Sequence, residues 1–256
     1  MSLLGEIGTL AWTRRTNGLL SRPEQVRYIA AAVREQARAT PPLVAYRLGF
    51  RRGRQATIGE DDLRIPDSPV ARDAVEECVA AQPGTLIEHN YRSFIFARAL
   101  GSLNSIPHDE ELLFVATMFH DAGALEPDRS DGGRCFTLKG AADVEAQLAR
   151  AGWPAERGAR AAEAITLHLN PVVSVDQGPE AHLMHDGVLL DAAGLQAWKI
   201  RTDSIDRVRS RHPRVRFSQE GGRLLADQAR AIPGCRTAAA LRAGFGVALR
   251  LGPWQD

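Results

Sequence analysis

Buried histidines are the residues of this sequence with the clearest capacity for chemistry. The chain has seven histidines. The apolar spacing around His89, His120, His168 and either His182 or His185 predicts that they lie in buried helices. An imidazole placed in a core without a partner loses its hydrogen bonds to water, which is costly, so such histidines are expected to be hydrogen-bonded or to bind a metal.

The dipeptide His120-Asp121 is the most specific feature among them. The apolar run LLFVATMF precedes it and Gly123 follows it, which places the pair at the inner end of a core helix. Neighbouring side chains on an α-helix point about 100° apart, so the pair can converge on one ion only near a helix end. A mixed nitrogen and oxygen set suits zinc, iron(II) or manganese. Such an ion lowers the pKa of bound water from about 16 to about 7.

The pattern of the surrounding chain predicts helices. Ser21, Pro23 and Glu24 predict the start of a helix over 21–38 with Val26 and its helically spaced neighbours on the apolar face, and Pro41-Pro42 is expected to stop it. Residues 1–20 and 47–66 are expected to be irregular, the latter with a solvated basic patch at 51–54. Further helices are expected at 70–81, 86–103, from Pro107 to Gly123, 139–151, 154–169, 180–194, 197–211 and 219–231.

These helices predict an all-α fold. No run of alternating β-branched residues predicts a strand, and sites in helical bundles form between facing helices. We expect three parts: a helix and linker packed on the core at 1–66, a helical domain at 67–215 and a helical extension at 216–256.

The order of the helical motifs resembles the HD-domain superfamily of metal-dependent hydrolases, and in particular its cyanamide hydratase-like branch. EHNYRSFIFA resembles the first-motif helix of that branch and DEELLFVATMFHDAG its second. RCFTLKGAADVEAQL, AEAITLHLNP and LMHDGVLLDAAG are similar to its later segments. The resemblance covers about residues 67–215 and implies an HD-domain helical bundle with an N-terminal helical extension.

The resemblance implies that His89, His120, Asp121 and Asp191 bind the metal. Asp186, five residues before Asp191 on the same predicted helix, is the alternative fourth ligand. Asp191 is preferred because it stands just before Ala-Ala-Gly. The expected cofactor is one divalent metal ion, with zinc favoured and iron(II) or manganese as alternatives.

Two further predictions concern catalysis. His168 matches a histidine beside the metal in the branch, so we expect it to move protons together with the catalytic carboxylate Asp121. An ordinary hydrogen-bonded core role is the alternative for His168, and it is the favoured role for His182 and His185.

Arg92 and Lys139 are the candidate substrate-binding residues. Arg92 follows His89 by three residues and shares its helix face, where it could orient an anionic group or a ligating carboxylate; an ion pair with Asp121 or Glu88 is the alternative. Lys139 stands where some two-metal HD phosphohydrolases offer another histidine, and this difference argues against a second metal.

The composition of the chain indicates which classes of partner to expect. The chain has 32 basic and 31 acidic residues and a formal net charge of +1, which calls for no nucleic-acid or membrane partner. Three widely spaced cysteines fit reduced thiols in a cytoplasmic protein. We expect a small-molecule substrate and allow for a homo-oligomer.

The leading functional expectation is a metal-dependent hydrolase or hydratase that activates water against a small molecule. The resemblance suggests a nitrile- or cyanamide-type carbon–nitrogen bond. The alternatives are a phosphohydrolase of a nucleotide or other phosphoester, and a non-catalytic HD-fold binding module. HDAGALE lacks the lysine that would help to neutralise a phosphate, which argues against the phosphoester.

Overall fold

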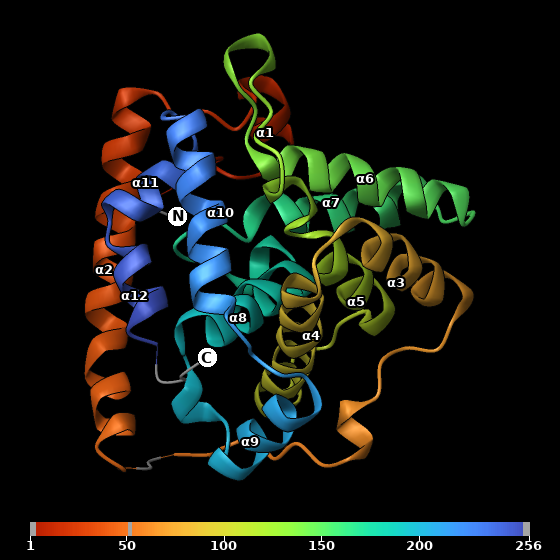
Figure 1. The fold of residues 1–256 in the computed structure, drawn as a ribbon, viewed down its shortest axis with the longest axis vertical. Helices are drawn as coiled ribbons and strands as arrows, with labels where there is room; N and C mark the ends of the chain where they lie inside the picture. The colour runs from red at the N-terminus through yellow and green to blue at the C-terminus, as the bar shows by residue number, and fades with distance from the viewer. Residues whose placement is uncertain (1–3, 51–52, 253–256) are drawn as a thin grey trace.

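The structure is a computed structural model that describes residues 4–50 and 53–252. Within these ranges the chain forms α-helices, short 3-10 turns and three isolated β-bridges, with no strand, so the predicted all-α fold is confirmed (Figure 1). The α-helices are α1 (Leu10–Thr16), α2 (Arg22–Arg47), α3 (Pro69–Ala81), α4 (Gly84–Asn104), α5 (Glu110–Phe119), α6 (Phe136–Arg150), α7 (Ala155–Leu167), α8 (Pro179–Ala193), α9 (Thr202–Arg211), α10 (Phe217–Ala231), α11 (Arg236–Arg242) and α12 (Phe245–Arg250).

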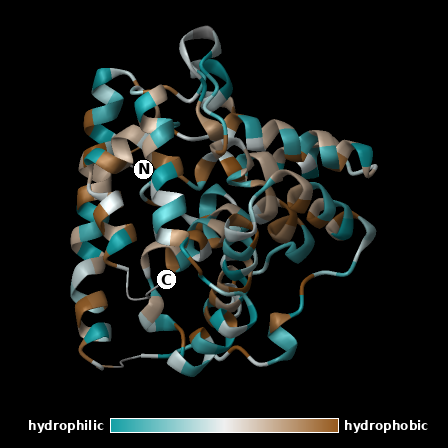
Figure 2. Ribbon diagram, in the orientation of Figure 1, coloured by the Kyte–Doolittle hydropathy of each residue, from teal (hydrophilic) through white to brown (hydrophobic). Residues whose placement is uncertain are grey.

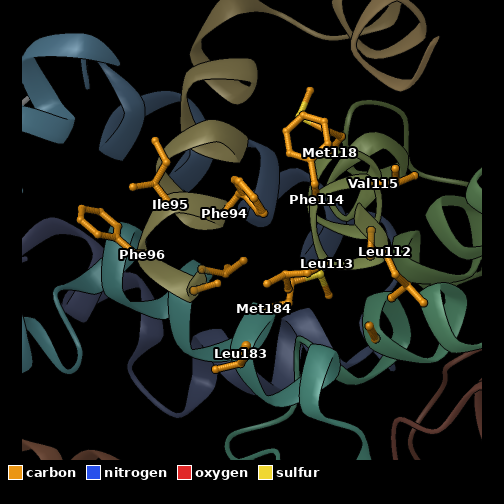
Figure 3. Packing of buried hydrophobic residues seen from close by; sticks show 14 of the residues in the cluster. Phe94, Ile95, Phe96, Leu112, Leu113, Phe114, Val115, Met118, Leu183 and Met184 are labelled. Carbon is orange, nitrogen blue, oxygen red and sulfur yellow. The ribbon is translucent and has the colours of Figure 1, made fainter. Parts of the chain in front are cut away.

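Helices α4, α5 and α8 form the centre of the core. Leu112 to Met118 on α5 are completely or almost completely buried, and so are most apolar residues of α4 and α8. Phe94 and Phe114 meet edge to face with ring centroids 5.0 Å apart, and Figure 3 shows both beside Met184 of α8. Because these helices are apolar on most sides, they are stable only when other helices surround them.

A glycine permits the close approach of α8 to α4. A methyl group added to Gly187 would lie 2.3 Å from the backbone oxygen of Ser93 and 2.8 Å from Cβ of Ala97. No side chain larger than hydrogen fits this crossing without a shift of one helix. The contact matters for the candidate site because α4 and α8 carry two of its residues.

Gly187→Ala is therefore expected to lower the free energy of unfolding by about 3 kcal/mol, the upper end for an overpacked core. Gly158→Ala is the control, since Gly158 is also a buried helical glycine but has nothing within 4 Å of an added methyl group. There the better helix propensity of alanine should raise stability by roughly 0.5–1 kcal/mol. Urea unfolding of both variants measures the free energies of unfolding. Equal changes in the two variants would show that the α4–α8 crossing at Gly187 has room for a methyl group.

Both ends of α5 are set by polar residues. Asp109 caps its start by accepting a hydrogen bond from the backbone nitrogen of Leu112, and Arg157 of α7 binds both oxygens of Asp109 at 2.8 and 2.9 Å. The α-helix ends at Phe119, and His120 is the residue that caps its C-terminus. The cap and the ion pair fix the position of the helix that delivers the His-Asp pair.

The N-terminal helix α2 differs from its prediction. It starts as expected, with the Ser21/Glu24 capping box, but it continues through Pro41 and Pro42 to Arg47. The carbonyls that Pro41 and Pro42 leave without an N–H donor are those of Ala37 and Arg38, and both residues are exposed, so water can bind these carbonyls. The predicted apolar face was also wrong, because Val26 is 69% exposed.

The buried face of α2 consists instead of Tyr28, Ala31, Ala32 and Tyr46, and Figure 2 shows hydrophobic and hydrophilic residues alternating along the helix. Three short helices that the sequence did not predict, α1, α11 and α12, lie in the N- and C-terminal segments. A separate small core unites these segments; its members are Leu4, Ile7, Trp12, Leu20, Tyr28, Ala31 and Ala239. The two chain ends therefore pack on each other (Figure 1).

The segment before α3 packs on the core through Ala56, Ile58 and Leu63. Ala56 and Ile58 are buried, and the backbone nitrogen of Ile58 donates to the hydroxyl of Ser204 at 2.9 Å. Of the predicted basic patch, Arg51 and Arg52 lie outside the described residues, and Arg54 is exposed. None of the helices in the described ranges has the length and apolar character needed to cross a membrane.

Candidate functional site

His89 is held in place by a buried aspartate from another helix. Its Nδ1 lies 2.6 Å from Oδ2 of Asp191 on α8, and both side chains are 1% exposed. A neutral imidazole that donates from Nδ1 to a carboxylate carries its lone pair on Nε2. This carboxylate–histidine pairing is the arrangement that commonly orients a metal-binding histidine.

His120 and Asp121 converge because the helix ends between them. His120 retains helical backbone angles, whereas Asp121 has φ −104° and ψ 2° and has left the α-helix. His120 Nε2 lies 3.3 Å from Asp121 Oδ2, although neighbouring side chains on a continuous helix would diverge. The sequence-based expectation that this pair sits at a helix end is confirmed.

The second nitrogen of His120 identifies which atom faces the site. Its Nδ1 lies 2.7 Å from the carbonyl oxygen of Thr117, and since a carbonyl only accepts, Nδ1 must carry the hydrogen. Burial opposes a charge on His120, but the Asp121 carboxylate beside Nε2 outweighs it and raises the pKa of His120. In the neutral form, which a metal requires, the buried Nε2 is a bare acceptor that makes no hydrogen bond of good geometry among the described residues. A buried acceptor without a partner is costly unless a cation occupies its lone pair.

These residues form a group that could hold a metal ion. One ligand atom from each of His89, His120 and Asp121 lies within 4.8 Å of the other two, and His89 Nε2 is 3.9 Å from Asp121 Oδ2. The bare Nε2 of His120, the same tautomer at His89 and the carboxylate between them fit a divalent cation that accepts nitrogen and oxygen ligands. Three protein ligands leave coordination positions for water or substrate.

His168 lies beside this group. It caps the C-terminus of α7, its Nδ1 donates to the carbonyl oxygen of Ile165 at 2.6 Å, and its Nε2 is 3.9 Å from Asp121 Oδ1. Burial and the nearby His120 lower the pKa of His168 to about 3. His168 is therefore neutral at physiological pH and presents an acceptor nitrogen toward Asp121.

The charge states of the ligand group follow from burial and proximity. Burial opposes the ionisation of Asp121, but the imidazoles of His120, His89 and His168 outweigh it and lower the pKa of the carboxyl group. Burial also lowers the pKa of His89 despite its bond to Asp191. A carboxylate and a neutral imidazole are the forms that bind metals.

Asp191 has a role that the sequence did not predict. Its oxygens accept from Arg92 Nε at 2.6 Å and Nη2 at 2.9 Å as well as from His89, and it is not a member of the three-residue group. Asp191 thus orients His89, and its role as a fourth ligand stays a prediction. The alternative ligand, Asp186, lies outside the His89–His120–Asp121 group. Its Oδ2 is 3.6 Å from Nε2 of His182, and its Oδ1 is 4.0 Å from Nε2 of His185.

His182 and His185 have hydrogen bonds to the core. Nδ1 of His182 binds the carbonyl oxygen of Val173 at 2.7 Å, and Nδ1 of His185 binds that of His168 at 3.1 Å. Neither histidine lines the cavity described below. The favoured expectation of structural roles for both agrees with these contacts.

The structure does not bring the two predicted substrate-binding residues to the site. Arg92 is completely buried and holds Asp191, one of the carboxylates predicted as metal ligands. This contact agrees with the expectation that Arg92 orients such a carboxylate, and it replaces the expected ion pair with Asp121 or Glu88. Its Nη1 also donates to the carbonyls of His212 and Pro213. Lys139 is 57% exposed, pairs with Asp143 at 2.6 Å and lines a different hollow on the surface.

Replacement of Arg92 by methionine is expected to lower the free energy of unfolding by about 3–5 kcal/mol, because Asp191 would remain buried without its counter-charge. Arg150→Met is the control: its ion pair with Glu77 is largely exposed, so about 1 kcal/mol or less should be lost. Denaturant unfolding in the presence of a chelator compares the two variants without a metal contribution. If both variants lose the same free energy of unfolding, the buried Arg92–Asp191 pair stabilises the protein no more than an exposed ion pair does.

A cavity of about 120 Å³ opens beside the ligand group, with His89, Asp121 and His168 in its wall. Asp121 keeps 18% of its side chain exposed, against 1% and 0% for His89 and His120. Phe217, the first residue of α10, stacks on His89 with ring centroids 4.3 Å apart. Sequence reasoning missed Phe217, which stood two residues before the helix predicted at 219–231, whereas the helix starts at Phe217 itself.

No protein-family model matches the chain, and no curated protein matches it.

Proposed function

We propose that this protein is a metal-dependent hydrolase or hydratase of the HD superfamily that acts on a small molecule. The single observation that carries the proposal is the convergence of His89, His120 and Asp121 beside a cavity that His89 and Asp121 line. The motif order described from the sequence supports the superfamily. As the group attacked we propose a polar carbon–nitrogen bond of the nitrile or cyanamide type.

His89, His120 and Asp121 would hold one divalent cation, for which we propose zinc. When bound, such a cation supplies Lewis acidity, which polarises the substrate and lowers the pKa of water from about 16 to about 7. Asp191 keeps the lone pair of His89 on Nε2 through its 2.6 Å contact with Nδ1, and Arg92 fixes Asp191 in turn.

His168 is the proposed proton carrier. Its Nδ1 is committed to the carbonyl of Ile165, so Nε2 is free to take a proton from the attacking water. In the hydration of a nitrile, the water oxygen bonds to the carbon while His168 Nε2 accepts the proton. The same nitrogen then returns the proton to the substrate nitrogen, and the histidine is neutral again at the end of the cycle.

The experiment is a substrate panel on zinc-loaded protein that contains cyanamide, simple nitriles and phosphoesters including nucleotides. We expect hydration or hydrolysis of a carbon–nitrogen bond that stops when a chelator removes the metal and returns when zinc is restored. Zinc content, measured on the same samples, provides a readout besides activity. Release of phosphate without any carbon–nitrogen product would overturn the proposed reaction, and zinc binding without any turnover would favour a binding module.

A further inference from the structure

The walls of the cavity beside the ligand group are largely apolar and come from both chain ends. Leucine, alanine, valine, proline and phenylalanine side chains make most of the surface. The apolar lining residues are Ala32, Leu86, Ala124, Leu169, Pro171, Val188, Leu189, Ala192, Leu195, Phe217, Leu224, Leu225, Ala240, Phe245 and Leu249. They lie on α2, α4, α8, α10, α11 and α12, in the 3-10 turn that contains Ala124 and in the segments that follow α7 and α8, so the terminal extensions contribute to the space in which a substrate would lie.

The neutral polar residues of the wall are already engaged with the protein. The hydroxyl of Tyr28 donates to the carbonyl of Leu169. Asn170 donates to the carbonyl of Ile7 at 2.7 Å and accepts from Arg236 at 3.2 Å. The amide nitrogen of Gln36 donates to the carbonyl of Ala243 at 2.9 Å. A ligand therefore meets few hydrogen-bonding groups along these walls until it reaches the ligand group itself.

The formal charges in the wall are carboxylates. Glu35 and Asp121 line the cavity, and among the described residues no lysine or arginine does. Glu35 forms ion pairs with two exposed arginines, Arg38 at 2.8 Å and Arg34 at 3.7 Å.

Of the three buried arginines near the site, Arg236 donates to the carbonyl of Thr166 and to Asn170, and the other two lie behind an aromatic ring of the cavity wall. The guanidinium carbons of Arg92 and Arg214 lie 5.7 and 4.9 Å from the ring centroid of Phe217, and the same ring stacks on His89. Arg92 is committed to Asp191, and Arg214 donates to the hydroxyl of Ser218 and the carbonyl of Ala192. Neither guanidinium lines the space that a ligand would enter.

From these observations we infer that the substrate is a small neutral molecule with an apolar body, and this inference rests on the proposed function. Its polar reactive group would lie against His89, Asp121 and His168, and its apolar body would lie among Leu224, Leu225 and the other wall residues. A phosphate monoester carries a charge of about −1.5 to −2 at pH 7. Such a charge is poorly accommodated by a wall that offers carboxylates and no guanidinium or ammonium group. Apolar cavities of roughly 150 Å³ hold a benzene ring, which suggests the size of the body.

Benzonitrile and phenyl phosphate provide a matched pair of probes, since they share the ring and differ in charge. Their dissociation constants are measured by titration calorimetry on zinc-loaded and zinc-free protein. We expect benzonitrile to bind at least about tenfold more tightly than phenyl phosphate to the zinc-free protein, because the ring leaves water in either case but only the phosphate loses its hydration without a cation. In the zinc-loaded protein the ion itself attracts the phosphate, so the preference should be smaller. Tighter binding of phenyl phosphate to the zinc-free protein would overturn the inference.

Leu225→Arg tests the location, since Leu225 is a half-buried wall residue. This variant should bind benzonitrile more weakly and phenyl phosphate more tightly than the wild type, so the preference for the neutral probe should disappear or reverse. Val33→Arg is the control because Val33 is 52% exposed on α2 and lies outside the cavity. If Leu225→Arg does not fold, Ala192→Leu fills the same cavity with an apolar group and should weaken the binding of benzonitrile. Unchanged benzonitrile binding in the folded wall variant would overturn the inference.

Zinc content of the same samples separates the two proposals. Protein that holds one zinc ion per chain but shows no preference for the neutral ring overturns the substrate class and leaves the metal site intact. Protein that prefers benzonitrile but binds no zinc overturns the proposed function and keeps the cavity as a site for neutral apolar molecules.

Discussion

Replacement of His120 by alanine is expected to lower the affinity of the protein for zinc by more than about a hundredfold. Mutation of a residue that only supports a metal ligand already lowers metal affinity by roughly 10–100-fold, and loss of the ligand itself should cost more. His120 Nε2 is a buried acceptor without a hydrogen-bond partner in the described part of the chain, and it lies within the only group of possible ligands found there. Zinc content and competition with a chelating dye measure the affinity. A second readout is thermal unfolding, because zinc at about 100 times its dissociation constant stabilises the native protein by roughly 2.7 kcal/mol.

His182→Ala is the matched control for this experiment. His182 lies on α8 and its Nδ1 also binds a backbone carbonyl, that of Val173, but it belongs to no metal-binding group. Its loss should leave zinc affinity unchanged. Zinc binding that survives in His120→Ala, or that disappears in His182→Ala, would contradict the assignment.

Replacement of His168 by glutamine is expected to lower turnover by about 10²–10⁴-fold, the usual contribution of a general acid–base. Glutamine keeps much of the volume and can donate to the carbonyl of Ile165, but it cannot carry a proton between water and substrate. Zinc content should stay at the wild-type level, since His168 is a neighbour of the ligand group rather than a member. Steady-state kinetics with the substrate found in the panel measure the loss in kcat.

His185→Gln controls for the loss of a buried imidazole near the site. His185 is 4% exposed and hydrogen-bonds the backbone of His168, but it does not line the cavity. Turnover in this variant should stay within about threefold of wild type, because no proton moves through it. If the two variants lose activity equally, or if His168→Gln also loses its zinc, His168 is not the proton carrier.

The place of His120 and Asp121 was predictable from the sequence because its cause is local, whereas His89 was assigned to the same site by the resemblance to the HD superfamily. An apolar run that ends in His120-Asp121 and is followed by Gly123 can only place two polar side chains at the end of a core helix, and the structure has them there. Helical spacing likewise put Arg92 on the same face of α4 as His89. The partner of Arg92 could not be derived, since Asp191 lies 99 positions further along the chain and is selected by the packing of α8 on α4.

The remaining differences arise from long-range packing. Helices α1, α11 and α12 have seven, seven and six residues, too few to be stable by propensity alone, so they depend on burial against the rest of the chain. Helix α2 continues through Pro41-Pro42 because that stretch faces water, which no local pattern indicates. The cavity wall was beyond sequence reasoning for the same reason, since Tyr28 and Ala240 meet there only when both chain ends fold onto the core.

Anomalous diffraction from crystals of the zinc-loaded protein, recorded on both sides of the zinc absorption edge, tests the central claim most directly. We predict one peak per chain, located between His89 Nε2, His120 Nε2 and the carboxylate of Asp121, with His168 beside it. The same map shows whether an oxygen of Asp191 also reaches the ion. A peak elsewhere, for example at His182, His185 and Asp186, or no peak at His120 in zinc-saturated crystals, would contradict the account.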